Sequence, residues 1–378
     1  MGAIAVAGLT ARWMAEAAAR DGFEVVALDL FGDVDTCAAA SRWMGIGSGM
    51  GLQIDEARTL EALALLARQG EVEGWVAGSG FEGRPALLAR GAALLPLLGS
   101  APDAVARLRD APAFFAGLDA HGIVHPEIAL VPPPEPAGWL LKDGHGCGGW
   151  HVREATKSLV REPLPPHHYW QRAVPGLAMS ATFVANGQAA VLLGFNRQIA
   201  RRIAGRPHVY SGIVGPLALD AVVAQHLQHI VDTLAAAYGL RGLASLDFML
   251  DGDRLAVLEV NPRPPASMDL YADWRPMRAH VRACLQGELP KPPASAAAAA
   301  GVYGNEIVFA NRPLRLDAEA AHWLQDWPEV HDLPCAGQRF EVDQPLCSVG
   351  ARGSNAAEVL ARLHESREAL LKSLETCT

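Results

Sequence analysis

The stretch Leu243–Pro265 has the pattern of a β-hairpin that carries polar side chains on one face. Two apolar runs flank a turn at Asp251-Gly252-Asp253, as in tight connections between antiparallel strands. We predict a three-residue loop, which places Asp247 opposite Val257 and makes Glu259 a diagonal neighbour of Asp247 on the same face. The opposite face is predicted to join the core through Phe248, Leu250, Ala256, Leu258 and Val260.

Asn261 follows Glu259 by two positions, so a strand keeps both side chains on the same face. Hard cations such as Mg²⁺ bind oxygen ligands, usually one or two carboxylates together with substrate phosphates. We therefore interpret Asp247, Glu259 and Asn261 as ligands of Mg²⁺ (or Mn²⁺). The alternative is a half-exposed hairpin whose polar face meets only water. The Glu-x-Asn-Pro-Arg sequence that ends an apolar strand favours the metal.

A glycine-rich loop follows Lys142, at the end of another predicted strand, and its composition suits phosphate binding. Its glycines match G-x-G-x-x-G, but Trp150–Arg153 predicts a strand where a dinucleotide-binding turn would have a helix. We interpret the loop as a mobile flap whose backbone N–H groups approach phosphates, with Lys142 as a point charge beside them. The alternative is a plain hairpin with an exposed lysine. The glycines concerned are Gly144, Gly146, Gly148 and Gly149.

The bulk properties of the chain restrict the classes of function. The 378 residues suggest two or three domains, and the net charge of −9 argues against nucleic acid as a partner. The chain contains no uninterrupted apolar run of ~18 residues, so we expect no membrane span. Six cysteines without a C-x-x-C pair argue against zinc and for reduced thiols, and the N-terminus lacks the basic region of a secretory signal. We therefore expect a cytoplasmic protein.

The first 100 residues have the pattern of an α/β domain. A strand at Ile4–Ala7, a helix from Thr10 to Asp21 and a strand at Glu24–Leu28 predict a β-α-β unit. The turn after the first strand lacks the dinucleotide-binding glycines, which disfavours a nicotinamide oxidoreductase. Open parallel sheets bind ligands at the carboxyl ends of their strands, so polar residues there are either substrate ligands or ordinary caps, turns and solvated groups. These residues are Thr10, Arg12, Asp29 and Glu82.

Antiparallel strands dominate the predictions for the rest of the chain. Asn186-Gly187 is a strong hairpin turn. A basic cluster follows, suited to an anionic ligand or to solvation alone, at Arg197, Arg201, Arg202 and Arg206. The predicted elements are strands at Met179–Ala185, Ala189–Gly194, Gly304–Ala310 and Gln338–Pro345, helices at Leu217–Tyr238 and Asn355–Thr376, and an alanine-rich link at Ser295–Ala300.

The order of these motifs resembles that of ATP-grasp enzymes over most of the chain. The motifs are Lys142 with its glycine flap, Gln171–Gly176, Asp247, and Glu259-x-Asn261-Pro262-Arg263. The resemblance implies α/β and α+β domains in the ATP-grasp fold, beginning with a Rossmann-like domain in residues 1–100. A small lobe with the flap (101–170) and a large lobe with the metal site (171–293) would clamp ATP. A small β-rich extension with a final helix (301–378) would complete the chain.

The same resemblance implies a role for each motif. Asp247, Glu259 and Asn261 would bind one or two Mg²⁺ ions, Lys142 would contact the ATP phosphates, and Arg263 would lie by the transferred phosphoryl group. The adenine would meet the hinge around 169–174, which contains Gln171, Arg172, Ala173 and Val174.

Two positions depart from the pattern of the family. Ala111 stands where many members have a lysine, so that Arg109 or nothing takes its place. Ala178 stands where many members have a ribose-binding glutamate. The sequence therefore supports binding of phosphates and metal more strongly than binding of adenosine.

Within the superfamily, short motifs are most similar to the tyramine–glutamate ligase group of methanofuran and methylofuran biosynthesis. These motifs lie at Gly176–Phe183, Asn196-Arg197-Gln198 and Asn261–Pro264. The stretches Gly8–Arg12 and Asp29–Asp33 also resemble ATP-grasp proteins of methylotrophic bacteria, which are associated with one-carbon cofactor pathways of the methylofuran and tetrahydromethanopterin type.

The reaction that the resemblance implies is ATP-dependent ligation of a carboxylate to an amine through an acyl phosphate. Arg197, Gln198 and Arg263 are candidates for gripping the carboxylate and the acyl phosphate, since arginine binds such groups with two nitrogens. Two rivals share the fold: a catalytically degenerate ATP-binding protein and a carboxylase. We expect a small-molecule acid and amine as partners. Homodimers are common in the superfamily, and a homodimer is one expectation for the assembly.

Overall fold

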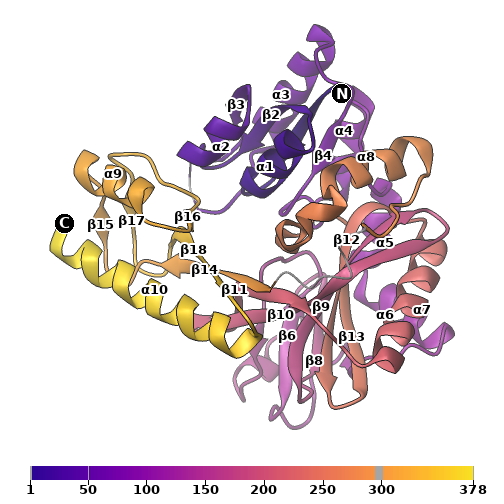
Figure 1. The fold of residues 1–378 in the computed structure, drawn as a ribbon. Coiled ribbons are helices and arrows are strands. Elements are labelled where there is room, and N and C mark those ends of the chain that lie inside the picture. Colours follow the sequence, from indigo (N-terminus) through magenta and orange to yellow (C-terminus); the bar gives the residue numbers. More distant parts are fainter. Residues whose placement is uncertain (1, 50, 294–300, 378) are drawn as a thin grey trace.

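The computed structural model describes residues 2–49, 51–293 and 301–377. An N-terminal α/β domain lies above a long antiparallel sheet, and the last helix runs along one end of that sheet (Figure 1). The predicted alanine-rich link at Ser295–Ala300 lies outside the described residues. No helix in the described ranges has the length and apolar composition needed to cross a membrane.

The N-terminal domain contains a four-stranded parallel sheet in the order β3-β2-β1-β4. Its central strands are almost wholly buried because apolar clusters cover both faces, as parallel sheets require. The elements are β1 (Ala3–Ala7), α1 (Arg12–Arg20), β2 (Glu24–Asp29), α2 (Val34–Ala39), β3 (Arg42–Gly45), α3 (Glu56–Gln69), β4 (Trp75–Ala77) and α4 (Pro85–Leu94).

The small lobe is a sheet of four short antiparallel strands in the order β5-β8-β6-β7. The predicted strand at 150–153 is wrong for most of its length, because Trp150 and His151 lie in a turn and the strand begins only at Arg153. The elements are α5 (Pro102–Arg109), α6 (Ala111–Ala120), β5 (Ile128–Ala129), β6 (Trp139–Asp143), β7 (Arg153–Glu154), η1 (Leu159–Arg161) and β8 (His168–Arg172).

An eight-stranded sheet in the order β13-β12-β9-β10-β11-β14-β18-β16 forms the body of the molecule. Side chains of α6 and α7 pack on one face, and η2 and α8 pack between the other face and the N-terminal domain. Residues on both sides of the predicted boundary near 293–301 contribute strands to this sheet. The elements are β9 (Leu177–Asn186), β10 (Ala190–Ile203), β11 (Arg206–Leu217), α7 (Ala221–Tyr238), β12 (Arg241–Asp251), β13 (Arg254–Asn261), η2 (Ala266–Trp274) and α8 (Pro276–Gln286).

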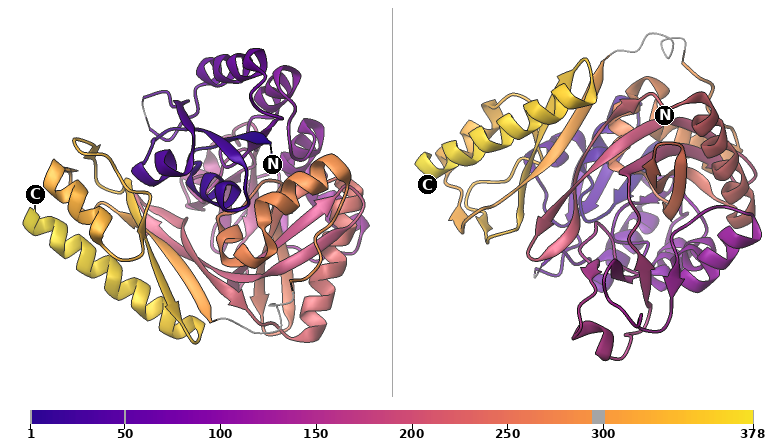
Figure 2. Two further views of the ribbon diagram at one scale, coloured as in Figure 1. Left: turned by 45° about the horizontal axis from the view of Figure 1, so that its top comes forward. Right: turned by 90° about the horizontal axis from the view of Figure 1, so that it is seen from below.

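The C-terminal part extends the sheet and covers its end with a long helix. The predicted strand at Gln338–Pro345 is wrong: only Arg339–Phe340 is extended there, and the long strand begins at Pro345. The helix α10 covers the end of the sheet that is farther from α7 (Figure 2) and buries Leu363 and Leu370 against β14 and β18. The elements are β14 (Val302–Phe309), β15 (Leu314–Arg315), α9 (Ala318–Asp326), β16 (Val330–His331), β17 (Arg339–Phe340), β18 (Pro345–Gly353) and α10 (Ala356–Cys377).

Candidate active site

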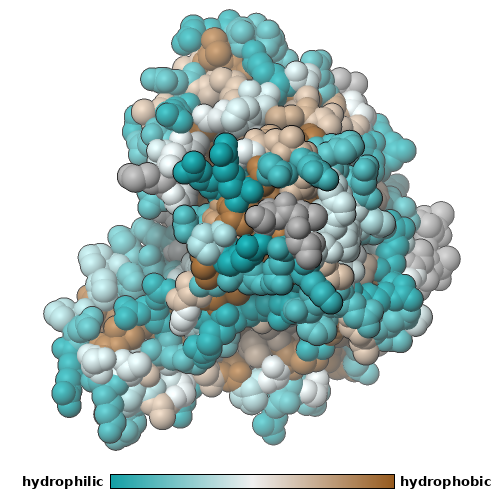
Figure 3. Space-filling model, turned by 90° about the vertical axis from the view of Figure 1, so that its left-hand side faces the viewer, coloured by the Kyte–Doolittle hydropathy of each residue, from teal (hydrophilic) through white to brown (hydrophobic). Residues whose placement is uncertain are grey.

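A cavity of about 1350 Å³ lies where the N-terminal domain, the small lobe, the large sheet and the C-terminal strands meet. Apolar side chains are visible in the recess beneath the N-terminal domain, which is at the top of Figure 3. The cavity is lined by residues as far apart in the chain as Leu9, Cys147, Asp247 and Ser348. Its walls therefore form only when all four parts of the fold are assembled.

The hairpin β12–β13 brings its two carboxylates together through a β-bulge. Asp247 lies directly opposite Glu259, and the next pair is Phe248 with Val257, so Leu258 is the extra residue of the bulge. The predicted pairing of Asp247 with Val257 is wrong because the three-residue loop omitted this bulge. The turn is also shorter than predicted, since Asp251 already pairs with Arg254.

The bulge also changes which side chains of β13 face the core, so part of the predicted core face is wrong. Val257, which was not assigned to the core, is fully buried in it, whereas Leu258 lines the cavity. Ala256 lies opposite Met249, another residue of the cavity wall, and is therefore not on the core face. Phe248 and Val260 are buried in the core as predicted, and Leu250 packs against it.

The oxygens of Asp247, Glu259 and Asn261 form a donor set that suits a hard divalent cation. The Asn261 amide donates to Asp247 Oδ2 at 3.1 Å, and its own Oδ1 accepts from Arg109 at 3.0 Å. The remaining oxygen, Asp247 Oδ1, is buried and has no partner among the described residues. Two facing carboxylates with one unsatisfied oxygen fit Mg²⁺, which prefers oxygen ligands and would satisfy that oxygen.

The two carboxylates differ in their pKa because their surroundings differ. Burial and the Glu259 charge raise the pKa of Asp247 despite opposing interactions with Gln198, Arg263 and Lys142. Burial also acts to raise the pKa of Glu259, but the nearby cations Lys142 and Arg109 outweigh it and hold that pKa below its ordinary value. In the absence of metal, the pair therefore tends to share one proton.

Arg109 is the residue that could replace the lysine that many family members have where this chain has Ala111. Its guanidinium is buried, lies 3.6 Å from a carboxylate oxygen of Glu259, and also contacts Glu82 at 3.6 Å. Glu82 in turn accepts a 2.6 Å hydrogen bond from Arg263 Nε. Burial acts to raise the pKa of Glu82, but the two arginines lower it below its ordinary value. Glu82 is therefore an ionised carboxylate that orients both guanidinium groups beside the candidate metal ligands.

Lys142 comes from β6 and points into the same cavity from the small lobe. Its ammonium group donates to Gln171 Oε1 at 3.2 Å and lies 5.9 Å from the centre of the Tyr169 ring. Burial acts to lower the pKa of Lys142, but Tyr169, Glu259 and Asp247 raise it above its ordinary value. The lysine is thus charged and is close enough to the carboxylate pair to interact with both members.

The glycine flap lies across the cavity and touches the large sheet. The Tyr210 N–H in β11 donates to Gly148 O at 2.9 Å, and a Cβ on Gly149 would collide with the carbonyl oxygen of His208. Trp150 packs edge-on against Phe309 of β14, with ring centres 6.2 Å apart. Gly144, Gly146, Gly148 and Gly149 all line the cavity. Cys147 also faces the cavity, and burial raises the pKa of its thiol to about 11, so it is not a thiolate at neutral pH.

Replacing Gly149 with alanine is expected to reduce ATP turnover by ~10-fold or more, because the flap can no longer lie against β11. Steady-state release of ADP measures the effect. Gly122→Ala is the matched control: Gly122 also has a positive φ (+67° against +75°), but no atom lies within 4 Å of its added Cβ. If both variants lost turnover equally, backbone strain would explain the loss and the docked flap would not.

The other residues that were predicted to bind the nucleotide lie in the hinge between the lobes. Gln171, Arg172, Ala173 and Val174 all line the cavity, together with apolar residues such as Met249 and Leu258. Gln171 Nε2 is buried and lacks a partner among the described residues, so it is free to donate to a ligand. Ala178 also lines the cavity, where it offers only a methyl group. The hinge thus combines apolar side chains with hydrogen-bonding groups, which suits a nucleobase.

The structure separates the other candidates. Gln198 and Arg263 line the cavity, whereas Arg197, the neighbour of Gln198 on β10, does not. Because successive residues of a strand point to opposite faces, Arg197 and Gln198 do not act together on one ligand. Asp29 is fully buried and accepts hydrogen bonds from three backbone N–H groups and from Trp43, and Arg12 is buried among carboxylates. Asp29 therefore stabilises the N-terminal domain, Arg12 joins that domain to Asp332 of the C-terminal part, and neither residue lines the cavity.

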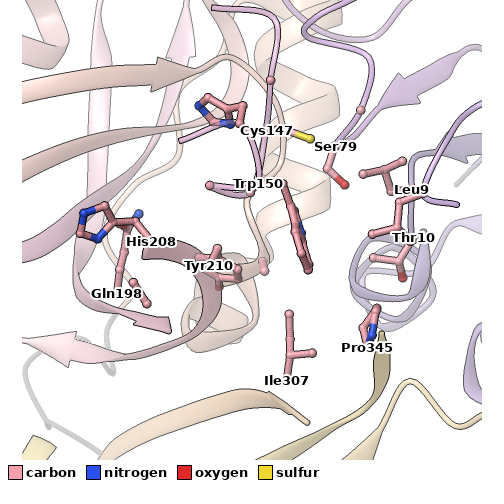
Figure 4. A pocket seen from close by; sticks show the side chains of 18 of the residues that line it. Leu9, Thr10, Ser79, Cys147, Trp150, Gln198, His208, Tyr210, Ile307 and Pro345 are labelled. Carbon is pink, nitrogen blue, oxygen red and sulfur yellow. The ribbon is translucent and has the colours of Figure 1, made fainter. Parts of the chain in front are cut away.

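Several cavity residues were missed by the sequence analysis. His208 and Tyr210 on β11 face Trp150 of the flap across the view in Figure 4, and Ile307 and Pro345 come from the C-terminal strands. Asp33 and Asp332 also line the cavity. No motif marks the C-terminal residues, and only the pairing of β11 with β14, and of β14 with β18, brings them to the site.

Comparison with known proteins agrees with this architecture. Residues 113–267 match the ATP-grasp domain family. The carbamoyl phosphate synthase large chain of Vibrio vulnificus is 25% identical over 235 residues, covering 54% of this chain and 21% of that protein. The chain spans about a fifth of the length of the curated relatives that it matches.

Solved structures match nearly the whole chain. The L-amino acid ligase from Bacillus licheniformis superposes with a TM-score of 0.69 at 14% identity, covering 97% of each chain. A biotin carboxylase complex with ATP from Campylobacter jejuni gives a TM-score of 0.71 at 12% identity, covering 99% of this chain and 95% of that one. The expected fold is therefore confirmed: the chain has the ATP-grasp fold, and its residues 113–267 match the ATP-grasp domain family.

Proposed function

We propose that the protein is an ATP- and Mg²⁺-dependent ligase that joins a carboxylate to an amine through an acyl phosphate. The observation that carries the proposal is the facing pair Asp247 and Glu259, which shares a cavity with Lys142, Arg263 and the glycine flap. Such a site suits a metal-bound nucleoside triphosphate, with cationic side chains beside the phosphates.

The chain's own residues would divide the work of the reaction. Asp247, Glu259 and Asn261 would hold Mg²⁺, which neutralises charge on the phosphates when bound. Lys142 and Arg263 would stabilise the phosphoryl group as it passes from ATP to a carboxylate oxygen, with ADP leaving. An amine would then attack the acyl carbon, release phosphate and lose its proton. The flap would exclude water, which would otherwise hydrolyse the acyl phosphate.

No nucleophilic side chain is needed for this sequence of steps. Cys147 is the nearest nucleophile in the flap, and the raised pKa of its thiol is consistent with a role in packing only. Catalysis would rest on positioning and electrostatic stabilisation, which the Glu82–Arg263 and Glu82–Arg109 contacts provide.

A carboxylase is the second candidate, because biotin carboxylase superposes on the chain as well as the ligase does. The two functions differ in the acid that takes the phosphoryl group: bicarbonate for a carboxylase, an organic acid for a ligase. A protein that binds ATP without turnover is the third candidate, favoured only by the alanines at 111 and 178.

The experiment that tests the proposal follows ADP and AMP during incubation with ATP, Mg²⁺ and pooled organic acids and amines. Tyramine with glutamate is the first pair to assay, because the short motifs around residues 176–183 and 261–264 resemble ligases of methylofuran biosynthesis. ADP together with a new amide supports the ligase. ADP formation that requires bicarbonate assigns a carboxylase, and tight nucleotide binding without turnover assigns the degenerate protein.

A further inference from the structure

A group of carboxylates surrounds a single guanidinium where the N-terminal domain meets the C-terminal strands. Arg12 contacts Asp332 at 2.7 Å, Glu16 at 2.8 Å and Asp35 at 3.6 Å. Asp33 is close enough to interact electrostatically with Asp29, Asp35, Asp332 and Arg12. Five carboxylates thus face one cation, so this end of the molecule has an excess of negative charge.

All of these carboxylates except Asp33 already have hydrogen-bond donors. Asp29 accepts from the backbone N–H groups of residues 11, 31 and 32, and Asp35 accepts from those of residues 332 and 333. Asp332 accepts from Arg12 and Ser348, and Glu16 accepts from Arg12. The side chain of Asp33 lines the cavity, is only 5% exposed, and forms no hydrogen bond or ion pair with any described residue.

An unpaired carboxylate in such a place is unfavourable unless a ligand compensates for it. Burying an ionised group without a partner costs several kcal/mol, so folded proteins nearly always pair or hydrogen-bond buried charges. Burial and the charges of Asp332, Asp29 and Asp35 raise the pKa of Asp33 to about 8, and Arg12 opposes them only weakly. The position therefore favours the arrival of a cation from the cavity.

The walls around Asp33 point to an organic cation. The cavity here is lined by the apolar side chains of Leu9, Trp13 and Phe31. Thr10 Oγ1 is buried in the same wall and lacks a partner within the described ranges. Figure 4 shows Leu9 and Thr10 opposite Pro345, on the far side of Trp150 from Gln198. This part of the cavity thus has an apolar wall in which the Asp33 carboxylate and the Thr10 hydroxyl lack partners among the described residues.

A metal ion fits this part of the cavity less well. Side-chain ligand atoms of Glu16, Asp35 and His331 lie within 4.8 Å of one another, but Asp33 is not among them. Arg12 already contacts both Glu16 and Asp35, so its guanidinium occupies the position of a cation in that group.

We propose that Asp33 binds the ammonium group of a substrate whose apolar part packs against Leu9, Trp13 and Phe31, with the Thr10 hydroxyl as a second polar contact. The substrate class is a primary amine with an apolar body. The identification of this ligand as a substrate rests on the proposed ligase function, whereas the binding site itself does not.

Binding of matched probes to the full chain tests the proposal. Hexylamine and hexanol have the same apolar chain, but only hexylamine carries a positive charge at pH 7.5. Isothermal calorimetry is expected to show hexylamine binding about 10-fold more tightly than hexanol, as one charge-assisted hydrogen bond contributes. Asp33→Asn is expected to abolish this preference, and Thr10→Val to reduce it. Asp253→Asn, in an exposed turn, is the control and should behave as the unmodified protein.

Three results would overturn the proposal. They are equal binding of both probes by the unmodified protein, an unchanged preference in Asp33→Asn, and stabilisation by Mg²⁺, Mn²⁺ or Zn²⁺ alone that Asp33→Asn removes. The last result would assign a metal site. The Glu259→Gln variant separates this proposal from the ligase: it should keep the preference for hexylamine even if ATP turnover is lost.

Thermal unfolding of the ligand-free variant gives a second readout. The Asp33 carboxyl has a raised pKa in the folded protein, so the folded state holds a proton that the unfolded state releases between about pH 4 and pH 8. Stability of the unmodified protein is therefore lost as pH rises through this range. Asp33→Asn lacks that loss, and its melting temperature should exceed that of the unmodified protein by an amount that grows up to pH 8. A lower melting temperature at pH 8 would contradict the unpaired state of Asp33.

Discussion

Glu259→Gln is expected to lower the rate of ATP turnover by ~10³-fold or more, because it removes one of the two carboxylates that would hold Mg²⁺ at the phosphates. The substitution keeps the size and shape of the side chain. It also removes the charge that pairs with Arg109 at 3.6 Å and interacts with Lys142, so those cations lose their compensation. Release of ADP with the pooled substrates measures the effect.

The control for this variant is Glu24→Gln, at the exposed start of β2. It makes the same chemical change far from the cavity lining and should keep normal turnover. Unchanged turnover in Glu259→Gln would remove the basis for the metal site. A loss of turnover in both variants would point to a general effect on the protein.

Arg263→Lys is expected to lower turnover by ~10²-fold while the dissociation constant for ATP changes by less than ~3-fold. Lysine keeps the positive charge but lacks the planar group of Arg263, which lines the cavity and bonds Glu82 through Nε at 2.6 Å. The variant should therefore bind nucleotide and fail to stabilise the phosphoryl group in transfer. Separate measurement of the catalytic rate constant and of ATP binding by calorimetry distinguishes the two effects.

Arg197→Lys is the matched control for that variant. Arg197 and Arg263 were both predicted to grip the acyl phosphate, but only Arg263 lines the cavity. We therefore expect near-normal ATP turnover in Arg197→Lys. Equal losses in the two variants would mean that Arg197 reaches the reacting groups after all and that the separation of these residues is not functional.

The main parts of the site could be predicted because they lie in local patterns. Alternation along a strand and a short turn sufficed to place Asp247, Glu259 and Asn261 on one face. Lys142 and its glycines form a loop whose composition alone suggests phosphate binding. The order of these two motifs along the chain then matched the order in ATP-grasp enzymes. The structure brings all of these residues to one cavity.

The errors arose where tertiary packing decides the backbone. The bulge at Leu258 changes which residues face the core, and nothing in the alternating pattern distinguishes Leu258 from Val257, since both are apolar. Similarly, the run 338–345 reads as a strand, yet most of it leaves the sheet because β18 from Pro345 onward takes the place beside β14. Pairing over long sequence distances decides both cases.

Arg109 and Asp33 illustrate what a family pattern alone leaves out. The alanine at position 111 left open whether Arg109 or nothing replaces the lysine, and the end of helix α5 brings the Arg109 guanidinium to Glu259 and Asn261. This position argues against a degenerate site, since a buried cation is kept beside the proposed metal ligands. Asp33 becomes a candidate binding residue only because the C-terminal strands close the cavity around it.

Binding of a non-hydrolysable ATP analogue tests the central claim most directly. Calorimetry with the β,γ-methylene analogue should show tight binding in the presence of Mg²⁺ and binding weaker by ~100-fold or more in EDTA, because the carboxylate pair repels unshielded phosphates. The same weak binding is expected of Glu259→Gln in Mg²⁺. Equal affinity of the unmodified protein with and without Mg²⁺ would contradict a metal-bound nucleotide at Asp247, Glu259 and Asn261.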